Sequence, residues 1–145
     1  VKRVNKQIDW DSYILFEQMA EGVCDELISE RPWKKYTDTK NIPHTEGIYV
    51  IGVKIKGKRN IQCLYLGRSK DVHKRLTNHK HGCQEIDKYV RRNFKNHREK
   101  DLRVKWIEEP KPKEKETAYI NCLEQKLDYK LEYNKIGRGK KYGKQ

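Results

Sequence analysis

The sequence predicts a small α/β domain of the mixed α+β type, because strand and helix patterns alternate along one chain. The length of 145 residues fits one domain and leaves little room for a second. Two runs rich in β-branched and aromatic residues flank a basic turn and predict a hairpin. Several segments carry apolar residues at steps of three and four and predict helices. The hydrophobic content of 34% is low but still allows one modest core.

The first expected element is an amphipathic helix over residues 9–29. Asp9 suits its N-cap, and Arg31-Pro32 would end it. Residues 31–46 are expected to form a connector. Residues 1–46 would therefore be a helical arm with its connector. A lone helix cannot bury its own apolar stripe, so we expect the arm to pack on the body.

The body, expected over residues 47–138, opens with a hairpin over residues 47–66. Both alternating faces of residues 47–53 are apolar, which predicts a central strand covered on both sides. Lys56-Gly57-Lys58-Arg59-Asn60 predicts the turn. Residues 102–107 alternate in hydrophobicity and predict a third strand.

Three helices are expected in the body. Asp71 would cap one that runs to about Lys80, and residues 85–96 would form the next. Pro110 and Pro112 break the chain, and a long helix is expected over residues 114–131. Residues 139–145 form a basic, glycine-rich tail.

The net charge of +13 is distributed unevenly. Residues 1–46 hold 7 basic and 9 acidic residues, whereas the rest of the chain holds 27 basic and 12 acidic residues. A body of that charge repels itself unless it finds an anionic partner. Because Lys and Arg neutralise phosphates, nucleic acid is the first candidate partner, and no membrane partner is expected.

The four cysteines are scattered and form no C-x-x-C pair. No secretory signal or long apolar run is visible, so we expect free thiols and an intracellular protein, nuclear in a eukaryote and otherwise cytoplasmic. The run from His79 to Cys83 lacks the paired spacings of a structural zinc site, so zinc is not expected.

Several polar residues could carry chemistry. Tyr49 and Tyr65 lie on the two expected hairpin strands and could share one face. Arg75 and His79 lie one helical turn apart beside an apolar stripe. Each residue taken alone is explained as well by packing.

Glu124 flanks the apolar stripe of the long helix, and Asn134 follows where that helix ends. A carboxylate held against a core needs a partner. A metal ion is one candidate, and a salt bridge is the better one if Glu124 is judged alone.

Taken together, these residues form a pattern that resembles the GIY-YIG nuclease family. The two triplets are Gly47-Ile48-Tyr49 and Tyr65-Leu66-Gly67, and the helix residues Arg75 and His79 follow at the family's spacing. The resemblance covers roughly residues 45–138. It departs from the pattern at Leu66, where Ile or Val is usual, and in the long gap between the triplets.

The resemblance implies a central three-stranded antiparallel sheet flanked by helices, here with an extra N-terminal helix. It also implies hydrolysis of DNA phosphodiester bonds with one Mg²⁺ or Mn²⁺ per active site. Glu124 would bind the cation, and Arg75 would donate to the non-bridging phosphate oxygens.

The resemblance also implies roles in proton transfer and in the positioning of other groups. Tyr49 would be the general base or would orient the water, while Tyr65 and His79 would orient groups or relay protons. Asn134 would order Glu124 or a phosphate. Which of Tyr49, Tyr65 and His79 takes the proton stays open.

The basic residues expected to hold the DNA backbone lie on the hairpin, around the first body helix and in the tail: Lys56, Lys58, Arg59, Arg68, Lys70, Lys74, Arg138 and Lys140. The alternative function is a non-catalytic nucleic-acid-binding module that keeps the fold. Within nucleases, restriction, mobile-element, repair and branch-resolving roles stay open. For the arm, packing is favoured over substrate recognition, self-association or a partner protein.

Overall fold

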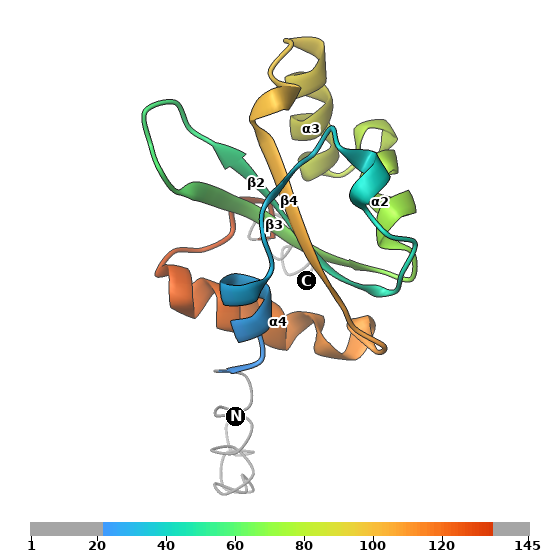
Figure 1. Cartoon of the computed structure of the whole chain (residues 1–145), viewed down its shortest axis with the longest axis vertical. Helices are drawn as coiled ribbons and strands as arrows, with labels where there is room; N and C mark the ends of the chain where they lie inside the picture. The colour runs from blue at the N-terminus through green and yellow to red at the C-terminus, as the bar shows by residue number, and fades with distance from the viewer. Residues whose placement is uncertain (1–21, 135–145) are drawn as a thin grey trace, which may run out of the picture.

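The structure, a computed structural model, describes residues 22–134. Within them lies a four-stranded antiparallel sheet in the order β1-β4-β2-β3 (Figure 1). The strands are β1 (Lys34–Lys35), β2 (Gly47–Lys54), β3 (Ile61–Ser69) and β4 (Leu102–Glu108). The α+β class is confirmed. Three strands were expected, and the structure has a fourth, β1, which pairs with the outer side of β4.

The added strand comes from the expected connector. Two lysines carry no alternating pattern, so nothing in the sequence marks β1 as a strand. The residues after it are also part of the body: Tyr36 and Ile42 are buried, and the Tyr36 hydroxyl donates to the carbonyl of Leu76 at 2.5 Å. Sheet and core residues therefore lie on both sides of the expected boundary at residues 46 and 47.

The helices of the body are α2 (Val72–Asn78), α3 (Glu85–Lys95) and α4 (Pro112–Leu127). The expected cap of α2 is confirmed, because the Asp71 carboxylate accepts a hydrogen bond from the Lys74 amide. Short 3₁₀ turns follow at His79–His81 and precede β4 at Glu99–Asp101, and a further one lies at Thr39–Asn41.

The ends of α4 differ from the expected range of 114–131. The helix begins earlier because Pro112 occupies its first turn, where proline has no hydrogen bond to lose. It ends earlier because Asp128 adopts a left-handed conformation, with φ of 63°.

Most of the expected N-terminal helix lies outside the described residues. Its described end contains a π-helical turn at Glu26–Glu30. Arg31 is extended, as a residue before proline tends to be, so the predicted stop at Arg31-Pro32 agrees with the structure.

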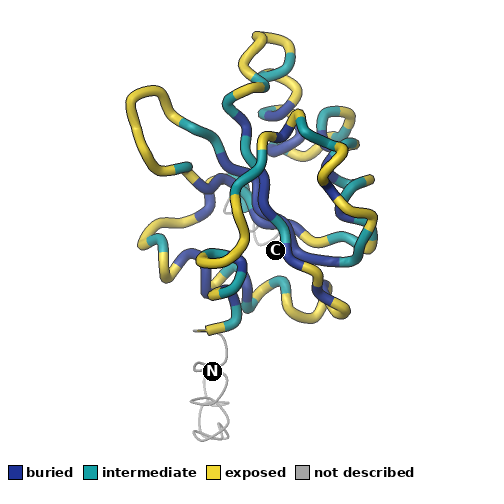
Figure 2. The backbone as a smooth tube through the Cα atoms, in the orientation of Figure 1, coloured by how far each residue is buried: buried dark blue, intermediate teal, exposed yellow. Residues whose placement is uncertain are grey.

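The sheet has an apolar cluster on each face. Helix α4 lies on one side of the sheet, and α2 and α3 lie on the other (Figure 1). On β2, Ile48 and Val50 face α4 and the N-terminal segment, whereas Tyr49 and Ile51 face α2 and α3. The expectation that this strand is central and covered on both sides is confirmed. Figure 2 shows the buried centre of the sheet and the exposed hairpin tip between β2 and β3.

The expectation of free thiols was wrong for two of the four cysteines. Cys24 and Cys122 form a disulfide that ties the end of the arm to α4. Spacing could not reveal this pair, because the two cysteines are 98 residues apart and meet only through packing. Cys63 and Cys83 are free thiols. No helix among residues 22–134 is long and apolar enough to cross a membrane.

Candidate active site

The two tyrosines of the paired triplets meet on one face of the hairpin. Tyr49 lies opposite Gly67, and Tyr65 lies diagonally from it, opposite Ile51. The rings of Tyr49 and Tyr65 have centroids 6.2 Å apart. The expectation that the phenols share a face is therefore confirmed. Tyr49 is fully buried, whereas Tyr65 is half-buried.

Gly67 leaves room for the Tyr49 hydroxyl. A Cβ atom at position 67 would lie 2.4 Å from the Tyr49 oxygen and 2.7 Å from Cε2 of Tyr65. Gly47 is constrained by β4, because a Cβ atom at position 47 would lie 2.3 Å from the carbonyl oxygen of Ile107. The glycines of both triplets therefore allow the strands and the Tyr49 ring to pack this closely.

The 3₁₀ turn after α2 brings His79 to the tyrosines. Its ring is fully buried, and its Nε2 lies 2.7 Å from the Tyr49 hydroxyl oxygen. The ring centroids of His79 and Tyr65 are 5.8 Å apart. The sequence placed His79 beside the apolar stripe, and the structure buries it at the centre of the site.

Asp87 completes this chain and was missed from the sequence. Its Oδ1 lies 2.5 Å from Nδ1 of His79, and its Oδ2 accepts a hydrogen bond from the Gln84 amide at the start of α3. A Cβ at Gly82 would lie 2.1 Å from Asp87 Oδ2, so the glycine makes space for the carboxylate. The sequence did contain a signal for Asp87: Gly82 follows His79 by three residues, and Asp87 then stands where an acid caps the next helix.

These contacts fix the tautomer of His79. An ionised Asp87 only accepts, so Nδ1 carries the proton and the bare Nε2 accepts from the Tyr49 hydroxyl. Burial and, secondarily, the Arg75 cation lower the pKa of His79 to about 4, against the opposing effect of Asp87. Burial raises the pKa of Tyr49 well above its usual range. At neutral pH both groups are uncharged.

Arg75 lies at the edge of this buried chain. Its Nη2 donates to Oε1 of Gln84 at 3.1 Å and lies 4.0 Å from Asp87 Oδ1. Its side chain is 29% exposed, so the guanidinium can also reach a ligand in solvent. The pKa of Tyr65 is raised by burial, and Arg75 opposes that rise. Arg75 and Tyr65 are thus the members of the cluster that face outward.

Glu124 has a different environment from the one expected of a metal ligand. It lies on α4, which covers the other face of the sheet, and it is only 6% exposed. Its Oε2 accepts from the Leu131 amide at 2.7 Å, and its Oε1 lies 3.7 Å from the Lys130 ammonium. This geometry favours a structural role, in which the carboxylate holds the chain that follows α4.

Asn134 binds the backbone of β3. Its Oδ1 accepts from the Leu66 amide at 2.8 Å, and its Nδ2 donates to the Leu66 carbonyl at 2.9 Å. The side-chain amide thus takes the place that a neighbouring strand would have on this edge. Asn134 therefore holds β3 at Leu66, the residue next to Tyr65.

A second carboxylate on α4, Glu116, acts electrostatically on Tyr65. Its Oε1 accepts from Nε of Arg68 at 3.2 Å, and its charge raises the pKa of Tyr65. Its side chain is 28% exposed. Glu116 was missed from the sequence because Glu114 and Glu116 alternate with lysines on the first turns of α4, as on a solvated helix face.

The basic residues expected to hold DNA are exposed where the structure describes them. Lys56, Lys58 and Arg59 lie on the hairpin tip, and Lys70 and Lys74 flank the start of α2. Arg68 is exposed as well but pairs with Glu116. Two further predicted contacts, Arg138 and Lys140, lie outside the described residues.

A hydrated Mg²⁺ or Mn²⁺ binds through one or two carboxylates, with water and substrate oxygens filling its other positions. Glu116 fits this requirement better than Glu124, because its side chain is 28% exposed, against 6% for Glu124, and its charge acts on Tyr65. Among the described residues, the cluster with three close ligand atoms is Cys24, Asp25 and Cys122. Its sulfur atoms are joined in the disulfide, so it offers no thiolate pair.

No family model matches the chain, and no curated protein matches its sequence. The GIY-YIG resemblance therefore rests on the residues of this chain and stays a prediction.

Proposed function

We propose that this protein is a DNA endonuclease that hydrolyses phosphodiester bonds with a single divalent cation. The observation that carries the proposal is the buried chain from Asp87 through His79 to Tyr49, beside the outward-facing Tyr65 and Arg75. A neutral histidine held by a carboxylate is a proton acceptor, and an arginine beside it is suited to a phosphate. The net charge of +13 supports a polyanionic substrate.

The proton from the attacking water would travel inward. The water gives its proton to the Tyr65 oxygen, and Tyr65 passes its own proton to Tyr49, whose ring centroid lies 6.2 Å from its own. Tyr49 passes its proton to Nε2 of His79, and the imidazolium that forms is stabilised by Asp87. This order assigns the contact with water to Tyr65, because Tyr49 is fully buried.

The displacement itself needs charge neutralisation. The new bond joins the water oxygen to phosphorus, the bond from phosphorus to the 3′-oxygen breaks, and that oxygen takes a proton from solvent. Arg75 would donate to the non-bridging oxygens as they gain negative charge. Glu116 would hold the cation, which supplies Lewis-acid stabilisation of the phosphoryl group when bound.

The alternative is a non-catalytic nucleic-acid-binding module. It is favoured by the environment of Glu124, whose two oxygens already face Leu131 and Lys130. If Glu116 also serves only to pair with Arg68, the protein would bind DNA and leave it intact.

Nicking of supercoiled plasmid with Mg²⁺ or Mn²⁺ tests the proposal. We expect nicking by the native protein, and a loss of about 100-fold or more in Tyr65→Phe and Arg75→Ala, because each removes a group that acts on the reacting phosphate. The matched pair Glu116→Gln and Glu124→Gln separates the two carboxylates. Glu116→Gln should lose metal-dependent nicking, and Glu124→Gln should retain it, since its amide oxygen can still accept from Leu131.

Two results would contradict the proposal. Absence of nicking by the native protein with both cations, together with intact plasmid binding, would favour the binding module. The second is loss of nicking in Glu124→Gln but not in Glu116→Gln, when circular dichroism shows that both variants are folded. That result would assign the metal ligand to Glu124.

A further inference from the structure

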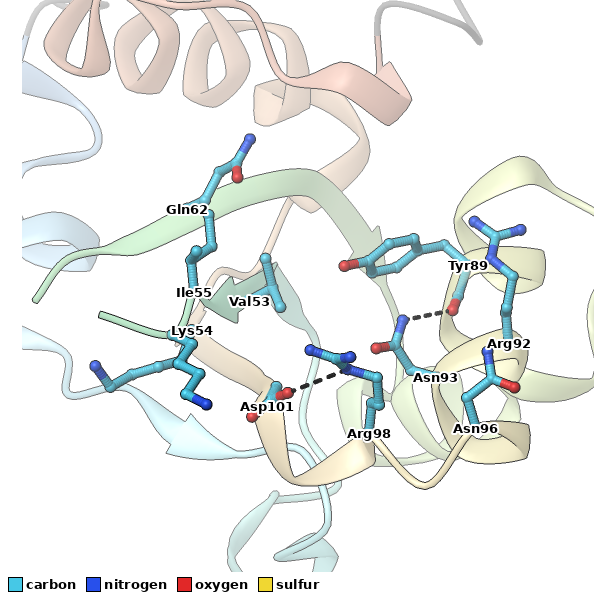
Figure 3. A pocket seen from close by; sticks show the side chains of 11 residues that line it. Val53, Lys54, Ile55, Gln62, Tyr89, Arg92, Asn93, Asn96, Arg98 and Asp101 are labelled. Carbon is cyan, nitrogen blue, oxygen red and sulfur yellow. Dashed lines mark hydrogen bonds and ion pairs between the residues drawn. The ribbon is translucent and has the colours of Figure 1, made fainter. Parts of the chain in front are cut away.

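A pocket of about 470 Å³ lies between the β2–β3 hairpin and the C-terminal end of α3 (Figure 3). Its walls include Gln62 from β3 and, from α3, Tyr89, Arg92 and Asn93. Nothing in the proposed reaction uses this pocket. Its volume falls within the range typical of small-ligand sites, roughly 300–1,000 Å³.

The charge of the pocket selects for an anion. Lys54, Lys56, Arg92 and Arg98 line it, against one carboxylate, Asp101. Asp101 is paired with Arg98, with Oδ2 3.6 Å from Nε, so one cation is partly neutralised. An excess of positive charge is left on the walls, and phosphate is the common biological anion that such a site binds.

The pocket also has a surface for a flat ring. The Tyr89 ring projects from α3 toward the hairpin (Figure 3). The Arg92 guanidinium lies 5.6 Å from its centroid, and the Tyr133 ring 5.4 Å. Nucleobases stack on such aromatic and guanidinium groups whatever their sequence.

Side-chain amides add hydrogen-bonding groups beside that ring. Nδ2 of Asn93 donates to the Tyr89 carbonyl at 2.9 Å, which orients the amide oxygen toward the pocket (Figure 3). Asn96 and Gln62 also line the pocket. Amides carry both donors and acceptors, which matches the edge of a base.

We propose that this pocket binds one unpaired nucleotide of a nucleic-acid strand, with the base against Tyr89 and the phosphate on Lys56 and Arg98. A duplex does not fit a pocket of this size, whereas a single nucleotide does. The proposal rests on the endonuclease function and narrows its substrate to DNA with a single-stranded segment beside the cut.

The position of the pocket supports this link. Gln62 in the pocket and Tyr65 in the candidate active site lie on the same strand, β3. Three residues of strand span about 10 Å, a distance that a few nucleotides of one strand cover. One nucleic-acid strand can therefore reach both places.

The test is binding of a five-nucleotide thymidine oligomer to the full chain, without divalent metal. NMR of the side-chain amides should show shifts for Asn93 and Asn96 on addition of the oligomer. Fluorescence anisotropy should show affinity reduced about tenfold in Lys56→Ala and in Arg98→Ala, as expected for loss of one charge-assisted contact. Lys35→Ala is the matched control, since it removes one positive charge from the opposite edge strand.

The outcomes separate this proposal from the enzymatic one. The proposal is overturned if the two amide signals do not move, if Lys35→Ala weakens binding as much as Arg98→Ala, or if inorganic phosphate alone moves the signals as strongly. Plasmid nicking is scored independently. Nicking without oligomer binding in the pocket refutes the pocket alone, and oligomer binding without nicking refutes the enzyme alone.

Discussion

His79 shows how a single buried residue depends on its neighbours. Its ring has no exposed surface and its two nitrogens contact Tyr49 and Asp87. Burial and Arg75 favour the neutral ring, and Asp87 opposes them. The folded protein therefore holds a histidine that takes up a proton less readily than it would in the unfolded chain.

This difference predicts a loss of stability in acid. With a pKa of about 4 in the folded state and about 6.5 in the unfolded state, the unfolded chain binds more protons between these values. The free energy of unfolding should therefore fall as the pH drops through this window, by roughly 2 kcal/mol between pH 7 and pH 5 from this residue. Urea unfolding at the two pH values measures it.

The control for this effect is a neighbouring histidine. His81 is exposed, and His81→Gln should retain the pH dependence of the native protein, whereas His79→Gln should lose most of it. An equal pH dependence in the two variants would mean that other groups cause the acid sensitivity.

Residue types and spacing predicted part of the site. Tyr49, Tyr65, Arg75 and His79 come together as expected, because a hairpin and the helix that follows it place them by local geometry alone. Asp87 and Glu116 were missed, because their contacts depend on how α3 and α4 return to the hairpin. Such long-range packing leaves no period in the sequence.

At the scale of elements, β3 is an edge strand, and an edge exposes unpaired amides and carbonyls. The chain after α4 covers part of this edge through the two hydrogen bonds between Asn134 and Leu66. Leu66 lies inside the second triplet, between Tyr65 and Gly67. The edge contact therefore supports the strand that carries the phenol.

Removal of the amide should loosen that edge. Asn134→Ala should cost about 1–3 kcal/mol of stability, because it leaves the Leu66 amide and carbonyl without their partner. Hydrogen exchange of the Leu66 amide should become faster. Glu132→Ala, an exposed neighbour on the same segment, is the control. Unchanged exchange in Asn134→Ala would show that the side chain does not protect this edge.

Elements with a strong pattern were predicted better than weak ones. The hairpin, α2, α3 and β4 lie close to their expected ranges because each has a clear apolar period. The two-residue strand β1 was missed because a pair of lysines has no such period, and only pairing with β4 defines it. The ends of α4 are set by Pro112 and by the left-handed conformation of Asp128, and the spacing of apolar residues predicts neither.

At the scale of the whole molecule, the two faces of the sheet differ in what they hold. The face under α2 and α3 carries the buried proton chain. The face under α4 carries the disulfide and Glu124. The disulfide joins residues 98 positions apart, so it strongly reduces the conformational entropy of the unfolded chain. It lies on the opposite face of the sheet from the proton chain.

Salt dependence tests how the net charge of +13 is used. Binding of a duplex, measured by anisotropy without divalent metal between about 50 and 200 mM salt, should weaken linearly on a logarithmic plot, with a slope of about −0.9 for each phosphate neutralised. Lys70→Ala and Lys74→Ala should each reduce the slope by about 1, because both lysines are exposed beside the candidate active site. Lys35→Ala, on the opposite edge strand, should leave the slope as it is. Equal slopes in all three variants would place the phosphate backbone on another surface.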